Sequence, residues 1–215
     1  MEIKICGFTR RKDIDEAVAL GVRIIGLNFY HKSPRYIPVD KAKEILINLD
    51  KNIKVIGVFV EPNEKYLFQV TDTLHLSGVQ LHGDEPPSLV EKIKREFPEK
   101  IVIKALRVKD KKGLEEGMKR YSPNFFLLDT YDVAIYGGTG KRISYSLLEN
   151  TYIPWGKVFL AGGITPNNIK EVISKFHPYG IDVASGVESA PGIKDKNKIK
   201  LLLKNVREIE ENETS

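Results

Sequence analysis

The chain has 215 residues, and its 34 lysines and arginines against 29 aspartates and glutamates give a formal net charge of +5 at pH 7. A content of 41% hydrophobic and 29% charged residues is that of an ordinary globular protein and excludes low-complexity and intrinsically disordered classes. The length suits one large α/β domain, and we expect a single domain over residues 1–215.

Eight short apolar segments recur along the chain, and each is followed by a longer stretch with helical periodicity. They are rich in Val, Ile and Phe, and their nearly continuous apolar character predicts strands that are buried on both faces. In chain order they span residues 3–6, 24–29, 55–60, 78–82, 101–106, 125–129, 158–162 and 180–184.

The intervening stretches carry apolar residues at every third or fourth position, as amphipathic helices do. Residues 41–49 form one such stretch, and residues 194–209 predict the last helix of the chain. Pro62, Pro86 and Pro166 each follow a polar residue, and we expect each of them to lie in the first turn of a helix.

Eight strand–helix units in 215 residues leave about 27 residues per unit, which is near the minimum that short loops allow. The predicted fold is therefore α/β, a single closed (β/α)8 TIM barrel with a parallel eight-stranded sheet. An open doubly wound sheet is the alternative, because alternation alone does not determine closure. No Gly-x-Gly-x-x-Gly motif follows the first strand, so the dinucleotide-binding form of that sheet has no support.

The cysteine count and the distribution of charge limit the location and the partners. Cys6 is the single cysteine, which excludes an intramolecular disulfide and a Cys-x-x-Cys metal or redox pair. The first residues lack the apolar run of a signal peptide and no segment reaches 18 apolar residues, so we expect a cytoplasmic protein without a membrane partner. Charges are interspersed except near residues 194–204, which favours a phosphorylated or carboxylated small-molecule substrate over nucleic acid.

In a barrel of this class, function lies at the carboxyl ends of the strands. Cys6 ends the first predicted strand and Asp129 ends the sixth, so a thiol base and a carboxyl acid are expected at one mouth. The thiol needs a cationic or hydrogen-bonding neighbourhood that lowers the pKa of Cys6 if it is to act as a base. Structural roles stay open, because a lone buried cysteine is often a small apolar side chain and a strand-end aspartate often caps a loop.

Other candidates at the mouth are groups that bind anions. Gly162, Gly163, Ser185 and Gly186 follow the last two strands, where barrels of this class bind phosphate through backbone N–H groups; tight turning explains the glycines equally well. Arg35, in the loop after the second strand, is a candidate for bidentate carboxylate binding, with an ordinary surface arginine as the alternative.

Three further features belong to the same end of the barrel. His82 ends the fourth strand as a candidate proton carrier or orienting donor, and the four histidines show no metal-ligand spacing. Asp182 lies in the eighth strand. Residues 131–141 contain Gly137-Gly138-Thr139-Gly140 and are long for such a loop, which predicts a lid over the mouth; a solvated loop is the alternative.

The motifs at these positions match a known family in order and in spacing. The matching stretches include residues 4–9 (KICGFT), 33–37 (SPRYI), 79–85 (VQLHGDE), 160–164 (LAGGI) and 182–188 (DVASGVE). On these motifs the chain resembles the phosphoribosylanthranilate isomerases of tryptophan biosynthesis from end to end. One departure is Ile143-Ser144-Tyr145, where the family usually has a Phe-Asp-Trp-like element.

The resemblance implies a (β/α)8 enzyme that converts N-(5′-phosphoribosyl)anthranilate into 1-(2-carboxyphenylamino)-1-deoxyribulose 5-phosphate by an Amadori rearrangement, without metal or organic cofactor. It implies Cys6 as general base and Asp129 as general acid. By the same resemblance Arg35 binds the anthranilate carboxylate. It places Gly162, Gly163, Ser185 and Gly186 around the phosphate and His82 and Asp182 at the mouth.

Two other functions are considered beside this one. Another phosphosugar barrel, such as the histidine-pathway isomerase that uses two aspartates, is disfavoured by a cysteine rather than an aspartate at the end of the first strand. A non-catalytic anion-binding or nucleic-acid-binding domain needs a clustered basic face with stacking aromatics, and only the lysine-rich start of the last helix approaches one. The sequence leaves the oligomeric state open and is compatible with a homodimer.

Overall fold

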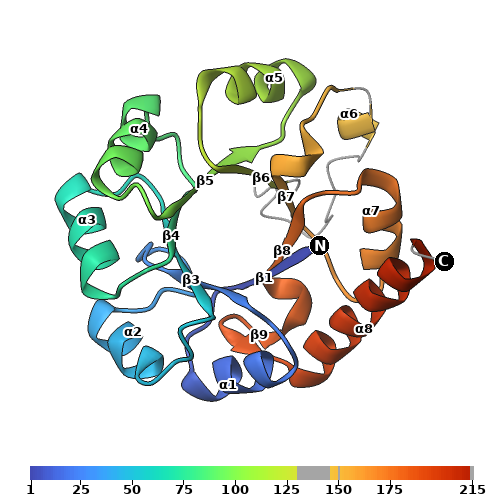
Figure 1. Cartoon of the computed structure of the whole chain (residues 1–215), viewed down its shortest axis with the longest axis horizontal. Helices are drawn as coiled ribbons and strands as arrows, with labels where there is room; N and C mark the ends of the chain where they lie inside the picture. Colours follow the sequence, from blue (N-terminus) through green and yellow to red (C-terminus); the bar gives the residue numbers. More distant parts are fainter. Residues whose placement is uncertain (130–145, 150, 214–215) are drawn as a thin grey trace.

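Eight parallel strands close into a barrel and helices cover its outside (Figure 1). The structure is a computed structural model that describes residues 1–129, 146–149 and 151–213. The strands follow one another around the barrel in sequence order, and β8 pairs with β1 to close it. The predicted (β/α)8 barrel is confirmed, and the open doubly wound sheet is excluded because the described sheet closes on itself.

The strands lie close to where the apolar segments predicted them. Their buried patterns show side chains covered on both faces, as expected for a parallel sheet between a barrel interior and a layer of helices. They span Glu2–Cys6 (β1), Ile24–Asn28 (β2), Lys54–Phe59 (β3), Gly78–Leu81 (β4), Ile101–Arg107 (β5), Phe125–Asp129 (β6), Val158–Ala161 (β7) and Gly180–Val183 (β8).

The helices alternate with these strands. They span Arg11–Ala19 (α1), Val39–Leu46 (α2), Glu64–Thr73 (α3), Pro87–Glu96 (α4), Lys111–Arg120 (α5), Ser146–Glu149 (α6), Ile169–Phe176 (α7) and Lys196–Glu213 (α8), with short 3₁₀ turns at Trp155–Lys157 (η1) and Ser185–Val187 (η2). None of the described helices is both long enough and apolar enough to cross a bilayer.

The prolines mark helix starts less exactly than predicted. Pro86 lies at the N-cap of α4 and Pro87 at its first position. In α3, by contrast, Pro62 precedes the helix, because the side chain of Asn63 accepts a hydrogen bond from the backbone N–H of Tyr66 and makes Asn63 the N-cap. Pro166 likewise lies before the N-cap of α7, in a turn.

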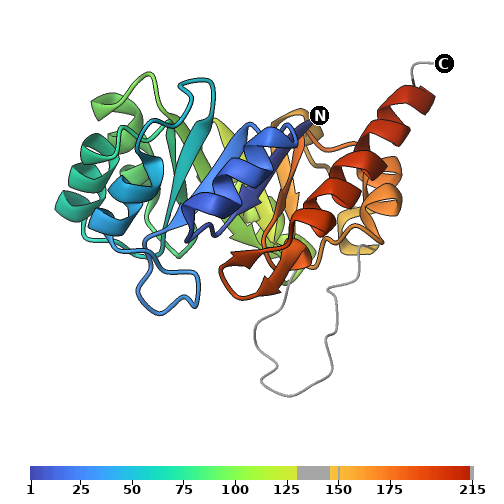
Figure 2. The same ribbon diagram turned by 90° about the horizontal axis from the view of Figure 1, so that it is seen from below.

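The last predicted helix begins too early. Lys194 belongs to a short strand, Ile193–Lys194 (β10), which pairs antiparallel with Glu188–Ala190 (β9), and α8 starts only at Lys196. Strands of two and three residues leave no periodicity in a sequence, so the hairpin was not predicted. Figure 2 shows the β9–β10 hairpin at the end of the barrel opposite the two chain termini, which is the end where the strands finish.

The barrel interior is apolar at its amino end and polar at its carboxyl end. An apolar cluster extends from the amino end of the interior as far as Ala161, the last residue of β7, and consists of Ile24, Ile56, Ile103, Ala105, Leu127, Phe159 and Ala161. The larger core lies between the strands and the helices. This packing closes one end of the barrel and leaves the other for a site.

Gly180, the first residue of β8, is tightly packed where β8 closes the barrel against β1. A Cβ at this position would lie 2.7 Å from the carbonyl oxygen of Glu2 and 2.6 Å from the ring of Phe159. We expect Gly180→Ala to lower the free energy of unfolding by about 1–3 kcal/mol, because backbone and ring must both move. Gly156→Ala is the matched control, since a Cβ there meets nothing within 4 Å and the change should stay within about 0.5 kcal/mol. Urea unfolding of both variants measures this; equal stabilities would contradict the packing argument.

Candidate active site

A cavity of about 440 Å³ opens at the carboxyl end of the barrel. It is lined by residues from seven of the eight strands or the loops that follow them, namely Cys6, Asn28, Arg35, Val58, Gln80, His82, Asp129, Ala161, Gly162, Gly163, Ile164, Asp182, Val183, Ala184 and Ser185. The structure thus brings together every residue predicted for the site except Gly186, which lies one position further along, in η2.

Cys6 is the last residue of β1, and its side chain is buried at the cavity wall. Lys4, two residues earlier, has the same orientation because side chains alternate along a strand, and it is completely buried inside the barrel. Its Nζ donates a hydrogen bond of 2.9 Å to Oδ2 of Asp182, its register partner on β8. A buried lysine–aspartate ion pair therefore lies beneath the thiol.

The charges around the thiol oppose the effect of its burial. Burial raises the pKa of Cys6, while the ammonium groups of Lys4 and Lys194 lower it and the carboxylate of Asp182 raises it; the net result is a pKa above the ordinary thiol value. Burial also lowers the pKa of Lys4, but Asp182 and Cys6 outweigh it, so Lys4 stays charged. The thiol thus has the cationic neighbours that a base requires, but in the described site the effect of burial on the pKa of Cys6 is larger than theirs.

Asp129, the last residue of β6, lies at the end of a chain of polar contacts. Nε2 of His82 is 3.3 Å from Oδ2 of Asp129, and Nε2 of Gln80 is 2.8 Å from Nδ1 of His82. An amide nitrogen can only donate, so Nδ1 accepts and a neutral His82 carries its proton on Nε2, facing Asp129. The carboxyl of Asp129 is 20% exposed, toward the cavity.

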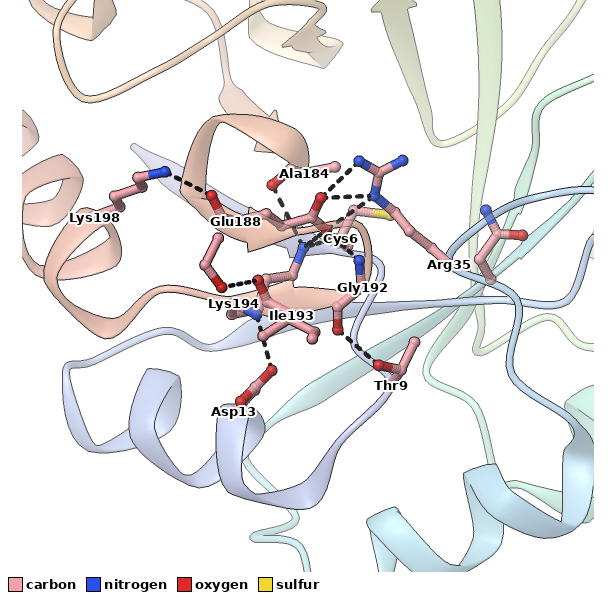
Figure 3. A network of polar contacts seen from close by, with 12 residues as sticks. Cys6, Thr9, Asp13, Arg35, Ala184, Glu188, Gly192, Ile193, Lys194 and Lys198 are labelled. Atoms are coloured by element: carbon pink, nitrogen blue, oxygen red, sulfur yellow. Dashed lines mark hydrogen bonds and ion pairs between the residues drawn. The ribbon is translucent and has the colours of Figure 1, made fainter.

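Arg35 is held in place by a buried carboxylate. Its Nε and Nη2 donate to Glu188 at 2.9 and 2.6 Å, and the carboxylate of Glu188 also accepts from Nζ of Lys194 at 2.7 Å (Figure 3). Hydrogen bonding to Glu188 raises the pKa of Arg35. Burial raises the pKa of Glu188, but its bonds to Arg35 and Lys194 outweigh this and lower it. Arg35 is therefore a fixed cation at the cavity wall and not an unconstrained surface arginine.

The glycines after β7 and β8 serve different purposes. Gly162 and Gly163 have φ of 93° and 64°, in the left-handed region that favours glycine, and both line the cavity. A Cβ on Gly163 would meet nothing within 4 Å. A Cβ on Gly186 would lie 1.9 Å from the carbonyl oxygen of Ile164, so close packing of the two loops requires glycine at this position. Tight turning accounts for Gly162 and Gly163 and close packing for Gly186, and their contact with phosphate stays a prediction.

Two other predictions concern metal binding and the lid. Within the described ranges no three His, Cys, Asp or Glu residues are grouped so as to hold a metal ion. The proposed lid, residues 131–141, lies outside the described residues, as does the departure at Ile143-Ser144-Tyr145.

Comparison with known proteins decides the family. The model of the family described as N-(5′phosphoribosyl)anthranilate (PRA) isomerase matches residues 3–205. The chain belongs to this family. A relative in Rippkaea orientalis, an N-(5′-phosphoribosyl)anthranilate isomerase, is 41% identical over 94% of this chain and 94% of its own. The resemblance drawn from the motifs is confirmed, and with it the expectation of an isomerase of tryptophan biosynthesis.

Solved structures of family members have the same barrel. The phosphoribosyl anthranilate isomerase of Thermotoga maritima is 34% identical, with a TM-score of 0.84, over 97% of this chain and 99% of its own. A second isomerase structure, 32% identical with a TM-score of 0.80 over 97% and 99% of the two chains, holds reduced 1-(o-carboxyphenylamino)-1-deoxyribulose 5-phosphate. Membership of this family excludes the two alternative functions, a different phosphosugar isomerase and a non-catalytic binding domain.

Three charged residues of this family member's site received no role in the sequence analysis. They are Lys4, Glu188 and Lys194. For Lys4 a signal existed: it interrupts an apolar strand two positions before Cys6, which puts a charge on the same face as the thiol. Glu188 and Lys194 belong to the unpredicted hairpin, so no strand position indicated where their side chains lie.

Proposed function

We propose that this chain isomerises N-(5′-phosphoribosyl)anthranilate to 1-(2-carboxyphenylamino)-1-deoxyribulose 5-phosphate, with Cys6 as general base and Asp129 as general acid. One observation carries the assignment: the thiol and the carboxyl group line the same cavity from β1 and β6, two strands that are not neighbours. A substrate in the cavity therefore has the base on one side and the acid on another.

The reaction needs one proton donated and one removed. Protonation of the ribose ring oxygen by Asp129 opens the ring and leaves an iminium ion at C1′. The iminium acidifies the proton on C2′, which the thiolate of Cys6 removes to give an enolamine. The enolamine then tautomerises to the ketone. No step requires a metal ion or an organic cofactor.

The remaining residues would bind the two anionic ends and the sugar. Arg35 would bind the carboxylate, and Gly162, Gly163, Ser185 and Gly186 would surround the phosphate. Asp182 and His82 would contact the sugar between them. In support, Oδ1 of Asp182 and Oε1 of Gln80 are buried atoms without a hydrogen-bond partner in the described structure, and hydroxyl groups of a bound sugar would supply donors for them.

The activity is tested with purified protein by following the fluorescence of phosphoribosylanthranilate as it disappears. We expect turnover without added metal and in the presence of a chelator. A protein that leaves the substrate fluorescence unchanged would overturn the proposed function.

Replacing Arg35 tests the carboxylate site. We expect Arg35→Ala to raise KM by about 10- to 100-fold, the usual cost of a charge-assisted hydrogen bond, and to change kcat less. Steady-state kinetics measure both constants. Arg23→Ala is the matched control, because this exposed arginine precedes β2 at the opposite end of the barrel. An unchanged KM in Arg35→Ala would remove this residue from the substrate site.

The proposal also includes a homodimer in the cytoplasm. In support of the dimer, the Thermotoga maritima isomerase is described as dimeric. Light scattering of the purified protein tests the dimer, and fractionation of the producing cells tests the cytoplasmic location.

A further inference from the structure

The β9–β10 hairpin is fastened to the end of β1, where the thiol of Cys6 lies, and to the segment from there into α1 (Figure 3). Oγ1 of Thr9 donates to the carbonyl oxygen of Gly192 at 2.6 Å, and the backbone N–H of Lys194 donates to Oδ2 of Asp13 at 2.9 Å. The Nζ of Lys194 donates to the carbonyl oxygen of Cys6 itself. The hairpin therefore has a defined position relative to the base.

The same hairpin determines the orientation of Arg35. Glu188 occupies Nε and one side of Nη2, so the described contacts leave the edge formed by Nη1 and the other side of Nη2 without a bond. The stem of Arg35 packs directly on Gly7, where a Cβ would lie 2.5 Å from Cδ of the arginine. Stem and guanidinium are thus fixed from two sides, and Arg35 is 22% exposed at the cavity.

The charges of Arg35, Glu188 and Lys194 do not sum to zero. Arg35 and Lys194 contribute two positive charges and Glu188 contributes one negative charge, and the side chains of Lys194 and Glu188 are only 1% and 4% exposed. One positive charge is left beside the cavity, at the unbonded edge of the guanidinium. A planar carboxylate matches that edge in charge and in geometry.

We propose that Glu188 and Lys194 are positioning residues that hold Arg35 with its unbonded edge toward the substrate carboxylate, and so make the enzyme selective for a substrate that carries one. This inference rests on the proposed function and deepens it. Glu188 and Lys194 do not touch the reacting atoms. They act through Arg35, which they prevent from turning away when the site is empty.

The test compares two stable ligands in binding experiments. One is reduced 1-(o-carboxyphenylamino)-1-deoxyribulose 5-phosphate, and the other is the same compound made from aniline, without the carboxylate. Glu188→Asp keeps the charge but shortens the side chain by one methylene, so it cannot reach both Arg35 and Lys194. We expect Glu188→Asp to weaken binding of the first ligand about tenfold and of the second less than about twofold, because only the carboxylate uses the orientation of Arg35.

Glu188→Gln separates orientation from net charge. It keeps the length of the side chain and leaves the cluster more positive. If the orientation of Arg35 matters, Glu188→Gln also binds the carboxylate ligand more weakly, while its affinity for the ligand without a carboxylate stays the same. In turnover experiments both variants should raise KM and leave kcat nearly unchanged. Tighter binding by Glu188→Gln together with unchanged binding by Glu188→Asp would show that only net charge matters, and would overturn the proposal.

Ser189→Ala is the matched control on the same hairpin, because the Ser189 side chain is exposed and its described hydrogen bond, to the carbonyl oxygen of Ile193, stays within the hairpin. It should bind both ligands as the unmodified protein does. Equal losses for both ligands in the Glu188 variants, with intact circular dichroism spectra, would mean a general distortion and would also overturn the inference. Failure of the proposed function is a separate result, since the unmodified protein would then not turn over phosphoribosylanthranilate.

Discussion

Replacement of Cys6 by serine is expected to lower kcat by about 10³- to 10⁴-fold, the contribution of a well-placed general base. A serine hydroxyl fits the same buried position at the end of β1, but it does not ionise in the range where a thiol does. Lys4 and Lys194 would remain beside it and could not make it a base. Binding of the reduced product analogue should change little, because Cys6 is assigned to proton transfer and not to the carboxylate or the phosphate.

The pH dependence gives a second measurement on the same residue. A base acts in its deprotonated form, and burial raises the pKa of the Cys6 thiol. We therefore expect kcat/KM of the unmodified enzyme to rise with pH through a pKa above the ordinary thiol value, and Cys6→Ser to lack this rise. Cys6 is the only cysteine in the chain, so thiolate absorbance reports its ionisation directly. A serine variant with near-normal turnover would end the assignment of Cys6 as base.

The fold could be predicted almost completely from local patterns. β6 was predicted with its exact bounds, and the other seven strands differ from their predicted bounds by one residue, at one end or, for β3, at both. This agreement has a physical reason: strands that are buried on both faces must be apolar throughout, and glycine or polar residues at their ends mark where burial stops. The positions at the carboxyl ends followed from the fold, which is why Cys6 and Asp129 could be placed at one mouth.

The contacts that tune the site could not be predicted in this way. The pairing of Arg35 with Glu188 joins residues 153 positions apart, and that of Lys4 with Asp182 joins residues 178 apart. No local periodicity encodes such a pair. From the sequence, a base at Cys6 requires cationic neighbours, but the sequence does not show which residues they are. In the structure Lys4 and Lys194 supply the positive charge, and burial raises the pKa of Cys6 by more than the two lysines lower it.

Replacement of Asp129 by asparagine is expected to lower kcat by about 10³-fold or more, with affinity for the product analogue nearly unchanged. Asparagine has the shape of aspartate and keeps a polar atom near Nε2 of His82, which lies 3.3 Å from Oδ2 of the native residue. It has no acidic proton to give to the ring oxygen. The ring then opens slowly, and Cys6 has no iminium from which to take a proton, so one defect stops both steps.

A control variant separates this chemical loss from a loss of charge at the barrel mouth. Asp84, in the loop after β4, is an exposed aspartate at the same end of the barrel and does not line the cavity of Asp129. Asp84→Asn removes the same charge, so its kcat should stay within about twofold of normal, as for a surface substitution outside the site. Comparable losses in the two variants would point to long-range electrostatics. A loss confined to Asp129→Asn, combined with that in Cys6→Ser, would be the outcome expected of an acid and a base that act in sequence on one sugar.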